Sequence, residues 1–546
     1  MSFRLILPLL YCSLAASQQF PGRIGVGLTE RRLSAREAIL KALESNLEIE
    51  VERANIAFAE AAIRGAKGAF DPAFRWLPGV QSRNNPTPSV LVSPDGKLSE
   101  DFLIQNFSLS QRVPWQGASL RLDFNNARQT TNNPFTSLTP FTNSQILLGL
   151  ELPLLRNRPI DRDRAQIRIR SKQLDVSRTE LELRTIDVIT RAESAYWDLL
   201  AARENVSVSQ EAVGLAEEQL GRTKRQIEAG TLAQVELAAA DAELERRRDT
   251  LFASVALVTE LENALKNLLL GDRKEELWNE AIVPEQGPPQ PLPDFSAWRD
   301  AVADALSRRP ELRQNAQRRE QNDIELELNR NQTKPQANLQ VGYSSAGLAG
   351  ALNPVENPFV ESNRELYGRV NQLSLLAGLP PLIPPGGGVA PPGFLGGYGQ
   401  VLSNLFGGNF QSIQAGVSFD LTLRNRAAEA AVAQSVIAER RLKLQRQQLE
   451  LRVETDVRNS YQALQSGQQR LAAATASVRA AKEKVESETR LFNSGESTNF
   501  LVLTRQNEYA ESRRRELLAQ LEINKSLAQL RRAAGRKTEH FGIQVR

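Results

Sequence analysis

Apolar residues recur at every seventh position along two long stretches of the chain. The first set is Leu199, Val206, Val213, Leu220 and Ile227, and the second set is Leu464, Leu471, Val478, Val485 and Phe492. A sustained seven-residue repeat predicts helices that bury one stripe against a partner helix. Each set ends just before a glycine, Gly230 or Gly495. We therefore expect each helix to stop there and the chain to turn back.

These patterns predict a duplicated pair of helical hairpins. In the first hairpin, a helix over 161–227 leads to the turn at Gly230 and to a return helix that ends before Gly271. In the second, helices over 427–492 and 499–534 flank Gly495. The longer helix of each hairpin should extend for roughly 100 Å, which is too far for one compact domain to cover. The helices are therefore expected to bury their stripes on one another, as in a coiled coil or a helical barrel.

A shorter helix is expected to open each half, over 34–67 and 296–331, and Ser34 with Glu37 forms a capping-box motif. The opening helix and the return helix together match the long helix in length, so they are expected to stack end to end beside it. The resulting order is a first repeat over 33–271 with its tip at 230, an equatorial linker over 272–294, a second repeat over 295–535 with its tip at 495, and a C-terminal tail over 536–546.

Between the opening and long helices, apolar and polar residues alternate, as in strands with one apolar face. The alternating apolar positions include Leu120, Leu122 and Phe124, then Leu339, Val341 and Tyr343, then Ile413, Ala415, Val417, Phe419 and Leu421. A soluble sheet packed on one side would explain any single strand. Aromatic residues near the strand ends and loops rich in Asn, Thr, Pro and Gly favour an outer-membrane β-barrel instead.

The pattern predicts about four strands in the chain and leaves a further hairpin, over 102–112 and 118–125, open. A long loop is expected over 345–410 within the second repeat. Its Pro- and Gly-rich part, 379–399, is either an extracellular loop or a disordered insert.

The N-terminal residues 1–17 have the pattern of a cleaved signal peptide, with Arg4 ahead of a short apolar run that is below the ~20 residues of a membrane span. The only cysteine, Cys12, lies in this segment, so neither disulfides nor thiol chemistry are expected in the mature chain. The 68 basic and 64 acidic residues are interspersed, which gives no reason to expect nucleic-acid binding.

Candidate chemistry is sparse. His540 is the only histidine, and it is more typical of a solvated tail than of a catalytic triad or metal site. No phosphate-binding or dinucleotide-binding glycine motif lies between a strand and a helix. We therefore expect no enzyme activity, no cofactor and no metal, and any energy source must come from a partner.

At several places, the residues resemble the TolC-like outer-membrane efflux protein (outer membrane factor) family. The resemblance rests on the paired openings Ala38, Ile39, Ala42, Leu43, Glu48, Ile49 and Ala301, Val302, Ala305, Leu306, Pro310, Glu311, Leu312, on the junctions 155–158 and 423–426, and on Tyr196 and Tyr461. Each of these short motifs alone is weak evidence for the family. The duplicated set in this order is stronger evidence, and the resemblance covers nearly all of the mature chain.

The resemblance implies a mainly α protein with membrane β-structure. Three copies would form a periplasmic α-barrel continuous with a 12-stranded barrel in the outer membrane of a Gram-negative-type bacterium. An oligomer is also expected on physical grounds, because open strand edges in lipid leave backbone groups unpaired. The implied function is the channel-tunnel of a tripartite efflux or type I secretion system, which passively conducts substrates from a periplasmic adaptor and an inner-membrane transporter. Drugs, metal ions and polypeptides all pass through members, so the cargo is open.

The resemblance also indicates candidate sites at the closed periplasmic end. The adaptor-docking tips are Ala229, Gly230, Thr231, Leu232, Ser494, Gly495, Glu496 and Ser497. The gate candidates are Glu236, Phe492, Leu501 and Thr504. Leu501 and Thr504 stand where well-known members hold an acidic ring, so we expect a constriction formed by apolar contact of Phe492 and Leu501.

Three other classes remain as alternatives. A secreted coiled-coil scaffold without channel activity would explain the seven-residue repeats but leaves the alternating strands without a purpose. A periplasmic adaptor should carry one helical hairpin and not two. A porin-like enzyme lacks a plausible set of catalytic residues.

Overall fold

The computed structural model describes residues 23, 27, 29–93, 95–285, 297–355, 357–383 and 390–536. The predicted signal peptide, residues 286–294 of the equatorial linker and the tail beyond 536 with His540 lie outside the described residues. The chain divides into two units, one made of Met1–Phe58, Leu174–Arg318 and Leu442–Arg546, and the other of Ala59–Gln173 and Arg319–Arg441. We call them the hairpin unit and the sheet unit.

The longest helices carry the seven-residue repeats. The helices in chain order are α1 Ala35–Ser45, α2 Leu47–Lys67, α3 Arg162–Glu228, α4 Val235–Leu269, α5 Trp298–Arg308, α6 Pro310–Gln332, α7 Pro358–Ala377, α8 Tyr398–Phe406, α9 Arg426–Asn493 and α10 Asn499–Ala533, with short 3-10 turns η1 Gly68–Phe70, η2 Glu276–Trp278 and η3 Pro392–Phe394. Helices α3 and α9 have 67 and 68 residues, and both begin and end within a residue of the prediction. No helix in the described part of the chain is both long and apolar enough to cross a membrane.

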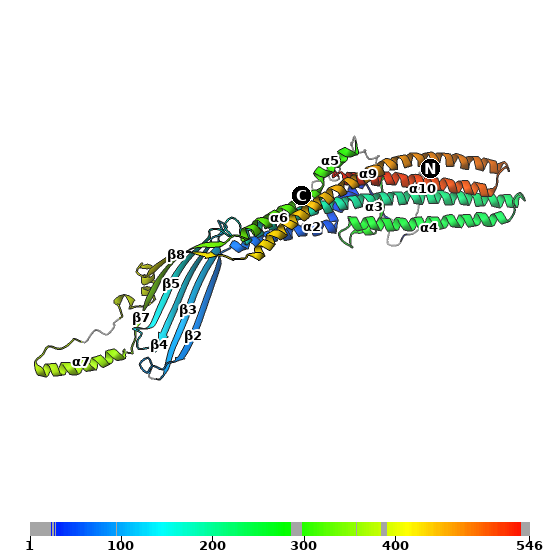
Figure 1. Cartoon of the computed structure of the whole chain (residues 1–546). Coiled ribbons are helices and arrows are strands. Elements are labelled where there is room, and N and C mark those ends of the chain that lie inside the picture. Colours follow the sequence, from blue (N-terminus) through cyan, green and yellow to red (C-terminus); the bar gives the residue numbers. More distant parts are fainter. Residues whose placement is uncertain are drawn as a thin grey trace, which may run out of the picture. The chain divides into compact units, whose positions relative to one another are not determined.

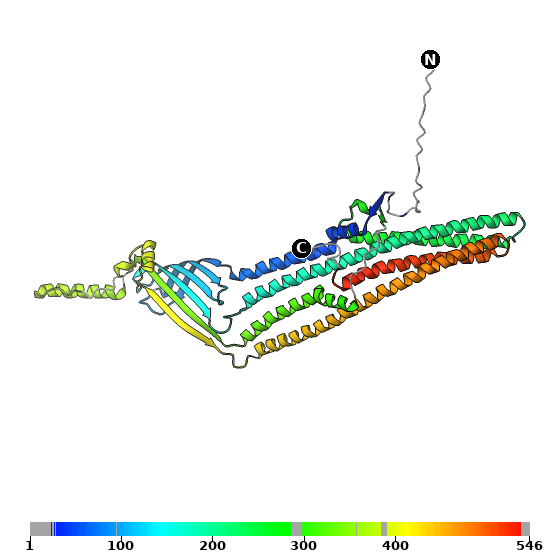
Figure 2. The same ribbon diagram turned by 90° about the horizontal axis from the view of Figure 1, so that it is seen from above.

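In the hairpin unit, α3 runs beside α4 and α9 runs beside α10 (Figure 1 and Figure 2). The repeat residues lie on the packed side, since Leu199 and Val206 are fully buried and Leu464 is 8% exposed. The largest apolar cluster joins α1, α3 and α4 and includes Tyr196, Val258 and Leu265. Five of the ten repeat residues are buried within one copy of the chain, and the other five are half-buried. The heptads are therefore partly covered within one copy.

Each opening helix is broken, which the prediction of one continuous helix over 34–67 and over 296–331 missed. Asn46 and Arg309 separate the two parts with extended backbone, at ψ of 122° and 127°. The Asn46 side chain donates to the Leu268 carbonyl at 3.1 Å and accepts from the Glu48 N–H at 3.0 Å. In the second repeat, Pro310 follows the break and disfavours a helical conformation at Arg309. The capping box of Ser34 and Glu37 is confirmed.

A small parallel sheet in the hairpin unit pairs a strand of the predicted equatorial linker with a strand that precedes α1. Strand β1, Glu30–Leu33, pairs with β6, Ala281–Pro284. The Tyr196 hydroxyl lies 3.0 Å from the Leu33 carbonyl and 2.7 Å from the Glu285 carbonyl. Burial raises the pKa of Tyr196 to about 12, so the hydroxyl stays protonated and tethers α3 to both strands. Neither strand was predicted, because each is only 4 residues long.

The sheet unit contains one antiparallel sheet of six strands in the order β2-β3-β4-β5-β7-β8. The strands are β2 Ala73–Pro86, β3 Lys97–Arg112, β4 Ser119–Thr131, β5 Leu138–Pro153, β7 Gln336–Leu352 and β8 Gln411–Asp420. The predicted count of about four strands is therefore wrong, and three copies would not give a 12-stranded barrel. The hairpin left open by the sequence, β3–β4, is present, and β2 pairs with its outer edge.

The two faces of this sheet differ in polarity, as the alternation predicted. One row of directly paired residues crosses all six strands on one face and consists of Phe74, Leu109, Leu122, Leu148, Tyr343 and Ile413. The neighbouring row on the opposite face consists of Arg75, Ser108, Asp123, Leu147, Ser344 and Ser412. Because successive side chains point to opposite faces, the sheet has one apolar and one predominantly polar surface.

The predicted loop over 345–410 is corrected, since it contains the end of β7 and the helices α7 and α8. Helix α8 packs on β7, where its Asn404 amide donates to the Leu348 carbonyl at 2.8 Å. Helix α7 begins with the N-cap Asn357 and Pro358 and ends at Gly378, which has a φ of +67°. These three signals are typical of helix ends and could have been recognised in the sequence.

Candidate hairpin tips and gate

Helix α3 ends in a tight turn built around Gly230. The Thr231 N–H donates to the Gln226 carbonyl at 2.9 Å, the Gly230 N–H donates to the Ile227 carbonyl at 2.9 Å, and Gly230 has a φ of +74°. This is the bonding pattern of a Schellman cap. A Cβ at Gly230 would meet nothing within 4 Å. The left-handed backbone, and not a lack of space, therefore requires glycine here.

The turn after α9 repeats this geometry. The Glu496 N–H donates to the Leu491 carbonyl at 2.9 Å, and the Gly495 N–H donates to the Phe492 carbonyl at 3.1 Å. Gly495 has a φ of +83° and open space around its Cβ position. Both predicted turns are thus present at the predicted glycines.

Most of the predicted tip residues are exposed. The exposed residues are Ala229, Gly230, Thr231, Ser494, Gly495 and Glu496, whereas Leu232 and Ser497 are half-buried. The return helices start differently. The Thr498 side chain caps α10 by accepting from the Leu501 N–H at 3.4 Å, while Gln234 before α4 makes no side-chain cap. The second tip is therefore the more firmly closed of the two turns.

A polar network stabilises the second tip. The Ser497 hydroxyl donates to the Glu488 carboxylate of α9, and Arg505 of α10 lies 3.7 Å from the same carboxylate. Arg505 also pairs with Glu508 at 2.9 Å. The carboxylates of Glu508 and then Glu488 raise the pKa of the Arg505 guanidinium. The network holds Ser497 against its own hairpin and leaves Glu496 free at the surface.

Glu236 takes part in a bridge between the two hairpins. The Asn499 side-chain amide of α10 donates to the Glu236 carboxylate of α4 at 3.3 Å, and the Gln219 side-chain amide of α3 donates to the side-chain oxygen Oδ1 of Asn499 at 2.6 Å. Gln219 is fully buried and Asn499 is 2% exposed. The sequence singled out Glu236 but missed the other two residues. Two amides separated by 280 positions give no local signal that they meet.

The remaining gate candidates occupy different environments. Phe492 is 5% exposed and packs inside its own copy, whereas Leu501 is 37% exposed. The Thr504 hydroxyl donates to the Phe500 carbonyl at 2.8 Å within α10. Phe500 itself is 72% exposed and was not predicted. Of the predicted apolar pair, only Leu501 is therefore presented to the outside of a single copy, together with Phe500.

Buried polar groups accumulate along the last turns of α3. Gln219, Thr223 and Gln226 lie on one side of the helix, and each has a buried side-chain oxygen without a hydrogen-bond partner. Such groups cost free energy when they stay unpaired. These unpaired groups make the packing between the hairpins near the tips less favourable than fully paired packing would be.

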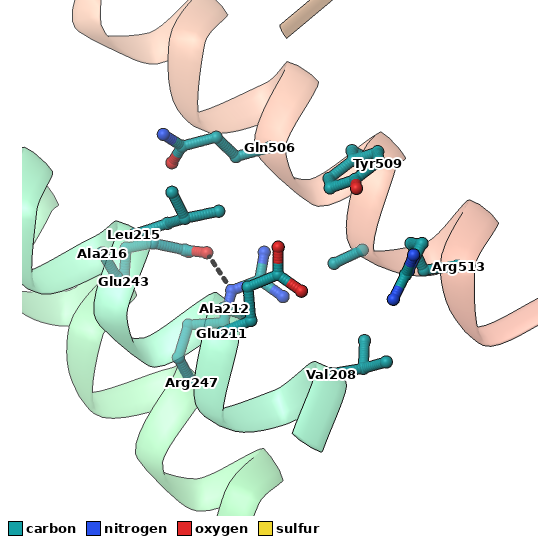
Figure 3. Close-up of a pocket in the computed structure, with 11 residues that line it drawn as sticks. Val208, Glu211, Ala212, Leu215, Ala216, Glu243, Arg247, Gln506, Tyr509 and Arg513 are labelled. Atoms are coloured by element: carbon teal, nitrogen blue, oxygen red, sulfur yellow. Dashed lines mark hydrogen bonds and ion pairs between the residues drawn. The ribbon is translucent and has the colours of Figure 1, made fainter. Parts of the chain in front are cut away.

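A small hollow between α3, α4 and α10 adds to this loose packing (Figure 3). It is lined by Val208, Glu211, Ala212, Leu215, Ala216, Glu243, Arg247, Gln506, Tyr509, Ala510 and Arg513. Arg247 pairs with Glu243 at 2.8 Å, and burial lowers the pKa of the Arg247 guanidinium. The described residues contain no cluster of His, Cys, Asp or Glu that could hold a metal ion.

Comparison with known proteins agrees with this geometry. The model of the outer membrane efflux protein family matches residues 116–271 and 301–536. No curated protein matches the chain.

Several solved structures share the fold at low sequence identity. A membrane protein from Pseudomonas aeruginosa is 13% identical with a TM-score of 0.62, covering 92% of this chain and 90% of that one. The CmeC outer membrane channel of Campylobacter jejuni is 14% identical with a TM-score of 0.61, covering 92% and 86%. The open-state MtrE outer membrane channel of Neisseria gonorrhoeae is 14% identical with a TM-score of 0.57, covering 92% and 89%.

Proposed function

The chain belongs to the outer membrane efflux protein family, and we propose that three copies of it form a channel that passively conducts substrates out of the periplasm. The six-stranded sheet would lie in the outer membrane, and the helical hairpins would extend into the periplasm. The channel would receive its cargo through a periplasmic adaptor from an inner-membrane transporter of an efflux or type I secretion system.

The observation that carries this proposal is the two-faced sheet with two open edges. Strands β2 and β8 each pair on one side only within one copy. An unpaired edge costs several kcal/mol for each unsatisfied backbone group in lipid, so the edges require neighbouring copies. The apolar face suits lipid and the polar face suits a water-filled bore. A secreted coiled-coil scaffold would need neither feature.

Three such sheets would supply eighteen strands to one barrel. Barrel diameter grows with strand number, and barrels of this size leave an aqueous channel. The proposed barrel is therefore wider than the twelve strands expected from the resemblance. The additional width comes from the first half of the chain, which contributes β2, β3, β4 and β5.

The adaptor is proposed to bind the two tips, at Ala229–Leu232 and Ser494–Ser497. Support comes from their exposure and from the rigid, duplicated caps at Gly230 and Gly495. Photo-crosslinkers at Thr231 and Glu496 should capture an adaptor from intact cells, and a crosslinker at the buried Ala240 serves as a control. Capture from Ala240 alone would argue against docking at the tips.

The gate is proposed to lie just behind the tips. Leu501 and Phe500 would narrow the bore where neighbouring copies meet, while the Glu236–Asn499–Gln219 bridge would hold the hairpins together. The unpaired oxygens of Gln219, Thr223 and Gln226 would make separation of the hairpins less costly, because water could then satisfy them. Phe492 would support this constriction from inside its hairpin.

Mass and conductance together test the proposed function. The purified protein in detergent should have the mass of a trimer and should form discrete conductance steps in planar bilayers. Leu501→Ala should raise the single-channel conductance, and Phe492→Ala should raise it less, because its side chain is buried. A monomer that is soluble without detergent would refute the channel. A trimer whose single-channel conductance is unchanged from wild type in both variants would refute only the apolar gate.

A further inference from the structure

Helix α2 is apolar on two opposite sides. Ile49 on one side belongs to the apolar cluster with α3 and α4. The exposed large apolar residues of α2 lie on the other side and are Leu47, Val51 and Phe58, at 59%, 58% and 76% exposure. The small residues Ala54, Ala61 and Gly65 extend this α2 stripe in alternating steps of four and three residues, which is coiled-coil spacing. A helix that is apolar on two sides needs a neighbour on each, and the described part of one copy covers one of them.

Helix α9 has a similar uncovered side. Leu442 and Val453 on one side are buried within the same copy. The opposite side carries Ala430, Ile437, Leu444 and Leu451 at steps of seven, and the last three are 67%, 52% and 66% exposed. Val436, which is 44% exposed, lies beside Ile437 and widens this α9 stripe there. Helix α9 therefore also lacks a neighbour on one side in the described chain.

Within one copy, α3 and α6 lie between α2 and α9. Ion pairs join α2 to α3 at Glu48 and α3 to α6 at Lys172. The Asn322 amide of α6 then donates to a carbonyl of α9 at 3.1 Å. Figure 2 shows this row of helices in the order α2, α3, α6 and α9, from blue to gold, where they meet the strands. The two helices with uncovered stripes are thus the two ends of the row.

The same two helices continue the open edges of the sheet. Helix α2 leads into the edge strand β2, and the other edge strand, β8, leads into α9. Strand β2 begins six positions after α2 ends at Lys67, and α9 begins six positions after β8 ends at Asp420. Pairing of β8 with β2 of the next copy therefore brings α9 of one copy beside α2 of the next, with the helix ends at similar heights.

The two stripes match in position and in charge. Phe58 and Ile437 lie 9 and 11 residues from the sheet ends of their helices, and Val51 and Leu444 lie 16 and 18 residues from them. Both pairs are offset by two residues, or about 3 Å along the axis. Residues 47–60 of α2 include four acidic residues and one arginine, whereas residues 437–452 of α9 include five basic and two acidic residues. These opposite charges favour α2 and α9 as neighbours.

We propose that the α2 stripe of one copy packs against the α9 stripe of the next copy, with Phe58 beside Ile437 and Val51 beside Leu444. This inference rests on the proposed trimer and names the helical surface that joins its copies. The two sides of the interface are different, so each copy contributes α2 to one interface and α9 to the other. Such head-to-tail interfaces close into a ring when the rotation between copies allows it, and three of them complete the wall of helices.

Disulfide crosslinking in the full-length protein tests this interface. In a Cys12→Ser background, the double variant Phe58→Cys/Ile437→Cys places one thiol on each side of every interface between copies. Mild oxidation of the detergent-purified trimer should give about tenfold or more covalent dimer and trimer than either single variant gives, because the facing thiols come within disulfide range. Each single variant is a matched control, since its three thiols lie in three separate interfaces. The yield should not change on dilution, because the partners belong to one trimer.

Light scattering of the reduced proteins separates this inference from the proposed function. A trimeric double variant that gives no more covalent product than the single variants overturns the interface and leaves the channel standing. A trimer whose Phe58→Cys thiol reacts with a charged maleimide as fast as in the dissociated chain overturns it too, because the α2 stripe is then open to water. A monomeric double variant beside a trimeric wild type supports the interface, since Phe58 and Ile437 are exposed within one copy. A monomeric wild type overturns both proposals.

Discussion

Gly230 and Gly495 are required by their backbone conformation, which makes the cost of replacing them predictable. A non-glycine residue in a left-handed conformation costs roughly 1–2 kcal/mol, and there is open space around both Cβ positions. Gly495→Ala should therefore lower the melting temperature measured by circular dichroism. Gly214→Ala is the matched control, because Gly214 lies within α3 and a Cβ there also meets nothing within 4 Å.

The control should shift the melting temperature in the opposite direction. Alanine is favoured over glycine inside a helix by roughly 0.5–1 kcal/mol, so Gly214→Ala should be slightly stabilising. The two Gly→Ala substitutions would then change the melting temperature in opposite directions. Equal effects at the two sites would show that the backbone at Gly495 is not left-handed in the assembled protein.

Glu48 links α2 to α3 in a pH-dependent way. Arg191 donates to its two carboxylate oxygens at 3.0 and 2.5 Å, and Arg184 to one at 3.3 Å. The hydrogen bonds from Arg191, more than any other cause, lower the pKa of Glu48. A lowered pKa means that the pair stabilises the fold above the carboxyl group's ordinary pKa and is lost as the pH falls through the folded-state value.

Glu48→Gln should therefore lower the melting temperature at neutral pH, and the difference from wild type should shrink as the pH falls below about 4. The loss should be no more than about 1 kcal/mol, because the Glu48 and Arg191 side chains are 41% and 39% exposed. Glu50→Gln is the control, since Glu50 pairs with Arg53 on its own helix. A difference that grows in acid would contradict the assigned direction.

Single residues could be predicted from the sequence where a local rule applies to them. Glycine at the end of a heptad pattern predicted both turns, and Ser34 with Glu37 predicted a cap. Asn499 could not be predicted as a bridge to Glu236, because the contact depends on how two hairpins 263 positions apart pack. The exposure of Phe500 likewise depends on packing that no local pattern determines.

At the scale of elements, the duplicated tyrosines make a test of the small parallel sheet. The Tyr196 hydroxyl is within 3.0 Å of carbonyls beside β1 and β6, whereas no described contact gives the Tyr461 hydroxyl a hydrogen bond. Tyr196→Phe should cost about 1 kcal/mol, because it removes a hydrogen bond that the buried hydroxyl makes to one of these carbonyls. Tyr461→Phe should be nearly neutral. Chemical denaturation of the two variants, compared with wild type, measures the difference.

If Tyr461→Phe lost as much stability as Tyr196→Phe, the two tyrosines would be equivalent. The hydrogen bonds of the Tyr196 hydroxyl beside β1 and β6 would then not be the source of the loss. The different surroundings of Tyr196 and Tyr461 also explain why the small parallel sheet was not predicted. The duplication in the sequence implied the same environment for both tyrosines. Only the first half contains strands beside its tyrosine in the described chain, and two four-residue strands are too short to recognise.

The long helices were predictable because a seven-residue repeat leads up to each glycine turn and no proline interrupts either helix over its 67 or 68 residues. The break at Asn46 was not, because it contains neither proline nor glycine and depends on a bond to Leu268 in another helix. Strand β2 was also missed. Pro78, Gly79 and the Asn84–Pro86 segment are residues that usually disfavour strands. An edge strand tolerates proline, because one side of its backbone needs no partner within the copy.

At the scale of the whole molecule, the polarity of the sheet decides how the chain meets lipid. Leu148 lies in the apolar row between Leu122 and Tyr343, while its neighbour Leu147 lies in the polar row between Asp123 and Ser344. Arginine on the lipid-facing side of a barrel costs roughly 2–4 kcal/mol near the middle of the bilayer. Leu148→Arg should therefore reduce the amount of folded trimer recovered from outer membranes.

Leu147→Arg provides the matched control, since the two leucines are adjacent in sequence and point to opposite faces. On the water-filled side, arginine is solvated, so this variant should assemble normally and should instead shift the ion selectivity of the channel toward anions. Heat-modifiable migration on gels measures assembly, and reversal potentials in a salt gradient measure selectivity. If Leu147→Arg blocked assembly while Leu148→Arg did not, the faces would be assigned the wrong way round. The apolar row would then line the bore.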